Sequence, residues 1–300
     1  MYTRPTEPRS IGGVLDDGLR LWRNSLPTTW PLALLAQLIV ALPFVVLAYQ
    51  FPGLFPTAPS PISATTAANA QAILALLKSP ATWLTYLVIT IFSVACYSAI
   101  VLRIGSVADN TALSLGGSLL AALRLLGRLL AQFLLFLLAL FAAALAVGVL
   151  GGFAGAALGG RGTVGVLLGV ILFLVLLFVF GRVFFASMVL ILDDAGPAQS
   201  IAISWRLTRD YWWRCAALLT VLLIIGLVFS LVVSVLSVSI GAAFGSATVL
   251  ATLVSTVLGL LVNSFLGSLF PAVLIAILHD LKLRKQGGDL LGRVDALARQ

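Results

Sequence analysis

Charged residues are scarce in this chain of 300 residues, and their scarcity excludes most soluble folds. Lysine, arginine, aspartate and glutamate make up 9% of the sequence, whereas hydrophobic residues make up 61%. A soluble domain has about 25% charged residues, so this chain lacks the polar side chains that a water-facing surface needs. The mean hydropathy of +1.15 supports the same conclusion. We therefore expect a membrane protein.

The residues that most often carry catalysis or bind metals are also nearly absent. The chain has one histidine, His279, and two cysteines, Cys96 and Cys215, which lie far apart in apolar segments. The cysteines are expected to be small core residues rather than a disulfide or a metal pair. No acidic pair falls inside an apolar run, and no glycine-rich phosphate loop follows a strand. The sequence therefore predicts no catalytic residue, no metal site and no cofactor, and a non-enzymatic protein.

The apolar residues form long runs that are rich in leucine, alanine and glycine. Runs of more than twenty residues without alternation are typical of membrane-spanning helices rather than of membrane strands. We predict an all-α polytopic membrane protein with a single six-helix domain over residues 1–300. The predicted transmembrane helices cover residues 30–51, 81–102, 129–158, 163–192, 215–244 and 247–278, and a polar cytoplasmic tail follows at 279–300.

Three short basic segments, which we call elbows, precede pairs of these helices at residues 9–24, 113–128 and 197–213. They contain the similar sequences LRLWRN, LRLLGR and WRLTRD, in each of which arginine is followed by leucine. Ser200 is expected to cap the helix of the third elbow. Amphipathic segments with tryptophan at headgroup level are typical of helices that lie in the membrane interface. The pattern predicts three repeats of an interfacial elbow helix plus a transmembrane hairpin.

Lysine and arginine are distributed unevenly between the two sides of the predicted helices. Sixteen of the eighteen fall in the N-terminal segment, near the elbows or in the tail, and only Lys78 and Arg161 fall on the other side. Because basic residues collect on the cytoplasmic side of membrane proteins, we expect both termini in the cytoplasm. No basic domain concentrates the charge, so nucleic acid is not an expected partner.

Two of the apolar segments carry small and polar residues at helical spacing. Ser230 and Ser234 share one face of the segment 215–244, and Asn263 lies on a similar face of the segment 247–278. Small side chains allow helices to pack closely, but the same faces could line a polar crevice for a headgroup or a solute. Pro271 is expected to kink the last helix. Both interpretations of the polar faces stay open.

Arg182 is the most costly residue to place in a membrane segment. Ten residues separate it from the Asp193–Asp194 pair at the cytoplasmic end of the predicted helix. A lone arginine at a helix centre costs roughly 2.5–3.5 kcal/mol on insertion scales. The side chain could reach the interface or pair with an elbow acid such as Asp210. It could alternatively bind an anion or a lipid phosphate.

Two stretches of the sequence resemble one known family. DDAGPAQSIAISWRLTRDYWWRCAALL places an acid and a Gly-Pro turn before Ser-Trp-x-Leu-Thr-Arg, and ILHDLKLRKQGGDLL is similar to the tail of the same family. This family is the membrane domain of glycerophosphoryl diester phosphodiesterases, which also forms stand-alone bacterial membrane proteins. The matching residues are Asp193, Gly196, Ser204, Trp205, Leu207, Thr208, Arg209, Trp213, Arg214, Asp280, Leu281, Arg284, Lys285, Gly287, Asp289 and Leu290.

This chain departs from the family pattern at Asp210, His279, Lys282 and Gln286, where the family has glycine, an aromatic residue, arginine and glutamate. The resemblance implies a multi-pass protein of the bacterial inner membrane. The family's soluble catalytic barrel has no counterpart in these 300 residues, so phosphodiesterase activity is not expected.

The sequence supports two functional hypotheses. In the first, the protein organises anionic lipid or a partner protein at the cytoplasmic leaflet, and the partners are membrane lipids, a second membrane protein or another copy of the chain. The residues predicted to contact headgroups or the partner are Arg20, Arg124, Arg206, Arg209, Trp205 and Trp213. The alternative is a transporter or channel for an amphiphile or anion through the last three predicted helices. Its intramembrane polar site would contain Arg182, Asn263, Ser230 and Ser234. A third possibility stays open, in which Arg20, Arg124 and Arg206 only fix the orientation of the chain in the membrane.

Overall fold

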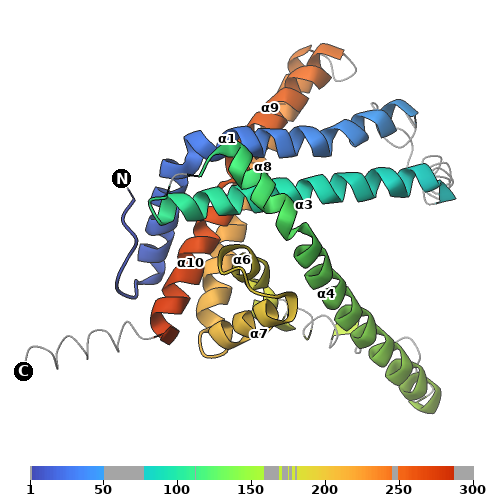
Figure 1. The fold of residues 1–300 in the computed structure, drawn as a ribbon. Helices are drawn as coiled ribbons and strands as arrows, with labels where there is room; N and C mark the ends of the chain where they lie inside the picture. The colour runs from blue at the N-terminus through green and yellow to red at the C-terminus, as the bar shows by residue number, and fades with distance from the viewer. Residues whose placement is uncertain are drawn as a thin grey trace, which may run out of the picture. The chain divides into compact units, whose positions relative to one another are not determined.

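The computed structural model describes residues 2–50, 78–111, 113–158, 169–170, 175, 178–179, 181–244 and 249–286, and this part of the chain is helical. Its helices are shown in Figure 1. They are α1 (Ile11–Gln50), α3 (Pro80–Ala108), α4 (Leu115–Leu158), α6 (Ala186–Leu192), α7 (Pro197–Thr208), α8 (Trp212–Phe244), α9 (Val249–Gly267) and α10 (Leu269–Gln286).

Four stretches of the described helices are long and apolar enough to cross a membrane, which supports the expectation of a membrane protein. They are Thr82–Ala108, Leu115–Ala146, Trp212–Phe244 and Leu253–Lys285. These stretches overlap the second, third, fifth and sixth predicted segments. Of the other two segments, residues 30–50 are helical within α1, and most of 163–192 lies outside the described residues. The arrangement of six helices in three repeats stays a prediction.

Two of the three predicted elbows are not separate helices. Residues 11–24 continue without a break into α1, and residues 115–128 continue into α4. Both helices begin with the same local contact. The Oγ of Ser10 accepts a hydrogen bond from the Gly13 N–H at 3.2 Å, and the Oγ of Ser114 accepts one from the Gly117 N–H at 3.0 Å. Each serine thus caps the first turn of its helix.

The helix α1 continues past residues 25–29, where the sequence predicted an interruption. The hydroxyls of Thr28 and Thr29 donate to the Ser25 carbonyl at 2.7 and 3.0 Å. These polar side chains are therefore satisfied inside the helix and do not cap a new one. A separate elbow helix occurs at the third position, where α7 ends at Thr208 and α8 begins at Trp212.

The helix α7 begins one turn earlier than expected, and the prediction that Ser200 caps it is wrong. Gly196 is the N-cap residue, and Pro197 is the first helical residue. Proline is favoured at this position because its missing N–H would have no partner in the helix. Ser200 instead lies within the helix, and its side chain is buried. Its hydroxyl donates to the Pro197 carbonyl at 2.8 Å and accepts from Gln132 Nε2 at 3.0 Å.

The last predicted membrane helix is interrupted close to Pro271, as its sequence indicated. The helix α9 ends at Gly267 and α10 begins at Leu269, so Pro271 lies in the first turn of α10. A proline is tolerated there because the first turn has no backbone acceptor for its N–H. The helix α10 then continues to Gln286, which makes the first part of the predicted tail helical. Residues 287–300 lie outside the described residues.

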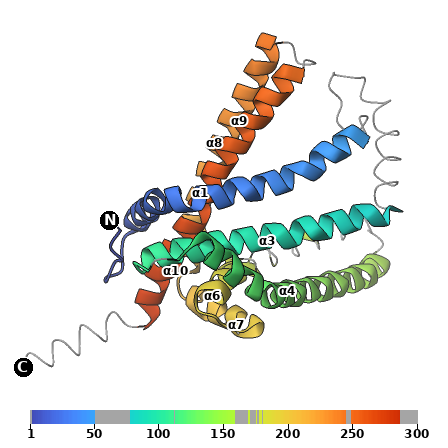
Figure 2. The same cartoon turned by 45° about the horizontal axis from the view of Figure 1, so that its top comes forward.

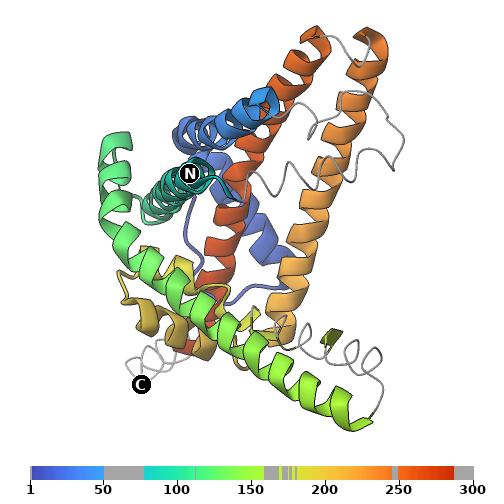
Figure 3. The same ribbon diagram turned by 90° about the vertical axis from the view of Figure 1, so that its right-hand side faces the viewer.

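The chain forms two compact units, each built from segments that are distant in sequence. Unit 1 contains Met1–Arg4, Asp17–Leu123 and Thr220–Val273, and unit 2 contains Pro5–Asp16, Arg124–Leu219 and Leu274–Gln300. In unit 1, two tryptophans of α1 form hydrogen bonds to serines at the end of α9. The indole nitrogens of Trp22 and Trp30 donate to the hydroxyls of Ser268 and Ser264, both at 3.1 Å. The neighbouring helices α8 and α9 run in opposite directions, as the arms of a hairpin (Figures 2 and 3).

Unit 2 has its own apolar core, in which α6 and α7 pack together. Phe185, Met188 and Leu190 from the α6 region are buried, and so are Ile277 and Leu281 of α10 in the same unit. This packing positions α7 and the start of α8, and therefore also the polar side chains that these helices expose.

Candidate functional site

The helix α7 buries small or polar residues and exposes its basic and aromatic ones. Ser204, Leu207 and Thr208 are among its buried residues. On the other side, Arg206 and Arg209 are exposed and Trp205 is 39% exposed. An exposed tryptophan among arginines is typical of a helix at the headgroup level of a membrane. The exposure of these residues is compatible with the predicted interfacial helix, which stays a prediction.

The other predicted headgroup contacts are exposed as well. Trp213, in the first turn of α8, is 80% exposed, and Arg124 lies exposed on α4 within the same unit. Arg20 is exposed on α1 and belongs to unit 1. Unit 2 thus carries five of the six predicted residues, which we call the basic surface: Arg124, Trp205, Arg206, Arg209 and Trp213.

Arg182 lies between aromatic rings of unit 2. Its Cζ is 4.9 Å from the centroid of the Phe178 ring and 5.5 Å from that of Trp205. These two rings meet edge to face, with an interplanar angle of 86°. Phe178 also contacts the ring of Trp212 at 5.9 Å. The guanidinium therefore lies among aromatic faces, which attract a cation.

The guanidinium of Arg182 has no matching acid among the described residues. Its Nε and Nη1 atoms are buried and make no hydrogen bond there. Asp210, the elbow acid suggested by the sequence as a partner, is paired instead with Lys285 at 2.6 Å. The hydrogen bond from Lys285 holds the pKa of Asp210 below its usual value. The pairing of Arg182 with Asp210 that the sequence suggested is therefore replaced by a pair between Asp210 and Lys285.

The backbone at Arg182 is fixed by α7. The hydroxyl of Ser204 donates to the Arg182 carbonyl at 2.8 Å, and the hydroxyl of Thr208 makes a longer contact with it at 3.4 Å. Next to it, Gly181 leaves room for Trp212, because a Cβ at that glycine would lie 3.2 Å from the indole Nε1. The indole nitrogen of Trp212 thus lies beside the residue that precedes Arg182.

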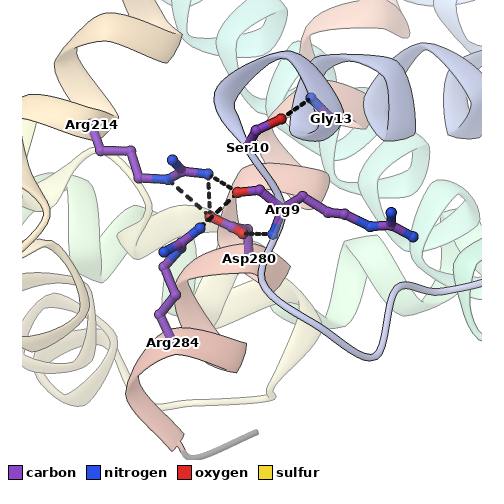
Figure 4. A network of polar contacts seen from close by, with 6 residues as sticks. All are labelled: Arg9, Ser10, Gly13, Arg214, Asp280 and Arg284. Carbon is purple, nitrogen blue, oxygen red and sulfur yellow. Dashed lines mark hydrogen bonds and ion pairs between the residues drawn. The ribbon is translucent and has the colours of Figure 1, made fainter. Parts of the chain in front are cut away.

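A buried carboxylate, that of Asp280, joins three segments of unit 2 (Figure 4). Asp280 is 4% exposed. Its Oδ2 accepts from Arg214 Nε at 3.1 Å and from Arg284 Nε at 3.0 Å, and its Oδ1 accepts from the backbone N–H of Arg9 at 2.9 Å. Both guanidinium groups also donate to the Arg9 carbonyl. We call this set the Asp280 network.

Further polar contacts surround the Asp280 network. Lys282 donates to Asp193 at 2.6 Å, and His279 Nε2–H donates to the Pro5 carbonyl at 2.9 Å. His279 therefore holds the N-terminal segment. Most of these residues belong to the two stretches that resemble the phosphodiesterase membrane domain, and in this structure the two stretches are in contact.

The polar residues predicted inside the membrane do not gather into an enclosed site among the described residues. Ser230, Ser234 and Asn263 are each exposed, and the Ser234 hydroxyl donates to the Ser230 carbonyl of its own helix at 2.9 Å. Unit 1 has an apolar groove of about 560 Å³, which none of the three lines. The groove is lined by Leu26, Pro27, Trp30, Phe229, Leu261, Val262, Phe265 and Leu266.

The sequence interpretation missed Arg103 as a buried cation. We predicted that the second membrane helix ends at residue 102, but α3 continues to Ala108 and places Arg103 in unit 1 at 8% exposure. Its Nε and Nη1 make no hydrogen bond to the described residues. The apolar character of residues 104–108, which follow it, was the signal that the helix continues.

No family model, no curated protein and no solved structure matches this chain. The resemblance to the phosphodiesterase membrane domain therefore stays a prediction, and the site has to be interpreted from its own geometry.

Proposed function

We propose that this chain is a non-enzymatic integral membrane protein that organises anionic lipid at the cytoplasmic leaflet of a bacterial inner membrane. The basic surface of unit 2 is the observation that carries the proposal. Three exposed arginines and two exposed tryptophans are presented by α7 and by the adjoining parts of α4 and α8. Each basic residue near an anionic membrane surface contributes about 1 kcal/mol of attraction.

Contacts between α4 and the α7 region hold the arginines of the basic surface in place. This arrangement supports lipid binding rather than a role limited to fixing the topology of the chain in the membrane. The Asp194 side chain pairs with Arg128 of α4, and Ser200 of α7 accepts from Gln132 of α4. These contacts fix α7 against α4, so the arginines on both helices keep a constant arrangement. The alternative of a transporter has no specific support from Ser230, Ser234 or Asn263, which are exposed.

Native mass spectrometry of protein released from nanodiscs tests the proposal. The nanodiscs contain equal amounts of phosphatidylglycerol and phosphatidylcholine, and wild type is compared with a variant carrying Arg124→Gln, Arg206→Gln and Arg209→Gln. Wild type should retain phosphatidylglycerol preferentially, and the preference should decrease in the variant and at high salt, because exposed charges are screened.

The control variant is Lys78→Gln, which also removes an exposed positive charge and lies on the side predicted to be extracytoplasmic. It should retain phosphatidylglycerol as wild type does. Equal lipid profiles in wild type and the triple variant would reduce the arginines to topology anchors and refute the proposal.

A further inference from the structure

The basic surface does not account for Arg182, whose guanidinium is turned toward aromatic rings. We infer that Arg182 and Trp212, together with the neighbouring rings of Phe178 and Trp205, form a binding site for one phosphate group. The phosphate of a phospholipid headgroup is the ligand class that fits best. The choice of lipid over soluble phosphate rests on the proposed function, whereas the site itself does not.

The first argument is the missing counter-charge. Buried charged donors in folded proteins are paired and hydrogen-bonded, because an unpaired buried charge is destabilising. The Nε and Nη1 of Arg182 have no acceptor among the described residues, and the carboxylate of Asp210 is taken by Lys285. An acceptor from outside the chain would complete the site.

The second argument is the chemistry of the donors. A guanidinium that stacks on aromatic rings has its donors in its own plane, and this planar fork matches two oxygens of a phosphate. Phe178 and Trp205 provide the stacking faces at 4.9 and 5.5 Å. The indole N–H of Trp212 lies close to the backbone of Gly181, one residue before the arginine, and adds a neutral donor. The nearest acid suggested by the sequence, Asp210, forms its ion pair with Lys285.

The third argument is the position of the site along the chain. Arg182 lies in the apolar helical stretch Gly181–Leu192, and the exposed Trp213 follows Trp212 directly. Tryptophans concentrate at the level of the lipid headgroups, where the apolar part of a membrane helix ends. A phosphate at this level belongs to a lipid, and its acyl chains lie along the apolar surface.

Thermal unfolding of the full chain in a mild detergent tests the inference with three additions. These are short-chain phosphatidylglycerol, a diacylglycerol with the same acyl chains, and inorganic phosphate. Phosphatidylglycerol should raise the melting temperature of wild type in a saturable way, because a ligand that binds the folded state stabilises it. The diacylglycerol, which lacks phosphate, should have no such effect.

The diagnostic variant is Arg182→Met, which fills similar space without the unpaired charge. Without lipid it should melt no lower than wild type. Its half-saturating concentration of phosphatidylglycerol should rise about tenfold to a hundredfold, since the charge-assisted hydrogen bonds are lost. Trp212→Phe keeps an aromatic ring and removes the N–H, so it should weaken the response less. It provides a second test if Arg182→Met fails to fold.

Lys78→Gln, which removes an exposed charge outside the basic surface, is the charge-matched control and should respond to phosphatidylglycerol as wild type does. A response to inorganic phosphate that also depends on Arg182 would support the site and assign a soluble ligand. Equal responses of wild type, Arg182→Met and Trp212→Phe would overturn the inference. That outcome would not refute lipid binding by the basic surface, because the nanodisc comparison tests that proposal separately.

Discussion

At the scale of single residues, the carboxylate of Asp280 organises the charges of unit 2. It is buried, and it accepts from two arginines and from one backbone N–H. A buried ion pair tolerates its loss of hydration only while every member keeps its partners. The stability of the Asp280 network therefore depends on this one acid more than on either arginine.

Replacing Asp280 with asparagine should destabilise the protein by about 3 kcal/mol, because Arg214 and Arg284 would lose their common counter-charge. Reversible unfolding in mixed micelles measures the change. The matched control is Asp109→Asn in unit 1, which removes the partner of Arg4 from an exposed ion pair. An exposed pair contributes about 1 kcal/mol or less. Equal effects of the two substitutions would contradict the assigned role of Asp280.

The pair formed by Asp210 and Lys285 should give stability that depends on pH. The pKa of Asp210 is lowered by the hydrogen bond from Lys285, so the folded state binds the proton less readily than the unfolded state. The stabilisation is therefore present above the unfolded value of 3.8 and is lost as the pH falls through the lower folded value. The difference in melting temperature between wild type and Asp210→Asn should stay constant from pH 7 to about pH 4 and decrease as the pH falls further. A difference that does not decrease at low pH would argue against the pair.

The sequence identified the unusual side chains but not their partners. Arg182 stands out because it is a charge in an apolar segment, and this property is visible in one sequence. The pairing of Asp280 with Arg214, 66 residues earlier, depends on the tertiary fold and leaves no local signal. The sequence suggested Asp210 as a partner for Arg182, whereas the structure pairs Asp210 with Lys285, 75 residues later in the sequence. Only the fold decides between them.

At the scale of helices, the composition predicted where helices occur better than where they end. Proline correctly indicated the interruption before α10, since its effect is a local steric one. The continuity of α1 through Pro27 was missed, because serine and threonine hydroxyls can satisfy either a cap or the helix interior. Ser200 was misassigned for the same reason, since Gly196 and Pro197 already begin α7.

Two glycines of α1 test how closely this helix packs. A Cβ at Gly18 would lie 2.9 Å from the Cα of Val273, a backbone atom that cannot rotate away. Gly18→Ala should therefore destabilise unit 1 by about 1–3 kcal/mol. Gly12 has nothing within 4 Å of the same position, so Gly12→Ala should stabilise the helix by up to about 1 kcal/mol. The two melting temperatures should move in opposite directions. A stabilising Gly18→Ala would show that the helices are further apart.

At the scale of the whole molecule, the number of membrane crossings is the main expectation that needs a test. The described residues contain four stretches that are able to cross, whereas the sequence predicts six crossings. The difference concerns residues 30–51 and 163–192. Cys96 and Cys215 are buried, so the wild-type chain should react little with a thiol reagent and offers a suitable background.

Single cysteines introduced as Lys78→Cys and Arg209→Cys distinguish the two possibilities. Both positions are exposed. Six crossings place three membrane helices between them, so a membrane-impermeant maleimide added to intact cells should label one position and not the other. If residues 163–192 do not cross, two helices separate the positions and both should behave alike. Permeabilised cells, in which both react, provide the control.

The Asp280 network also has a consequence for how the chain is made. The backbone of Arg9 bonds to a residue 271 positions later in the sequence. At synthesis rates of about 5–20 residues per second, the N-terminal segment waits roughly 15–55 s for this partner to leave the ribosome. During that interval unit 2 lacks α10, and Arg214 has no Asp280 with which to pair. A chain truncated before α10 remains in this state, so ribosome stalling or premature termination yields a protein that quality-control proteases can recognise.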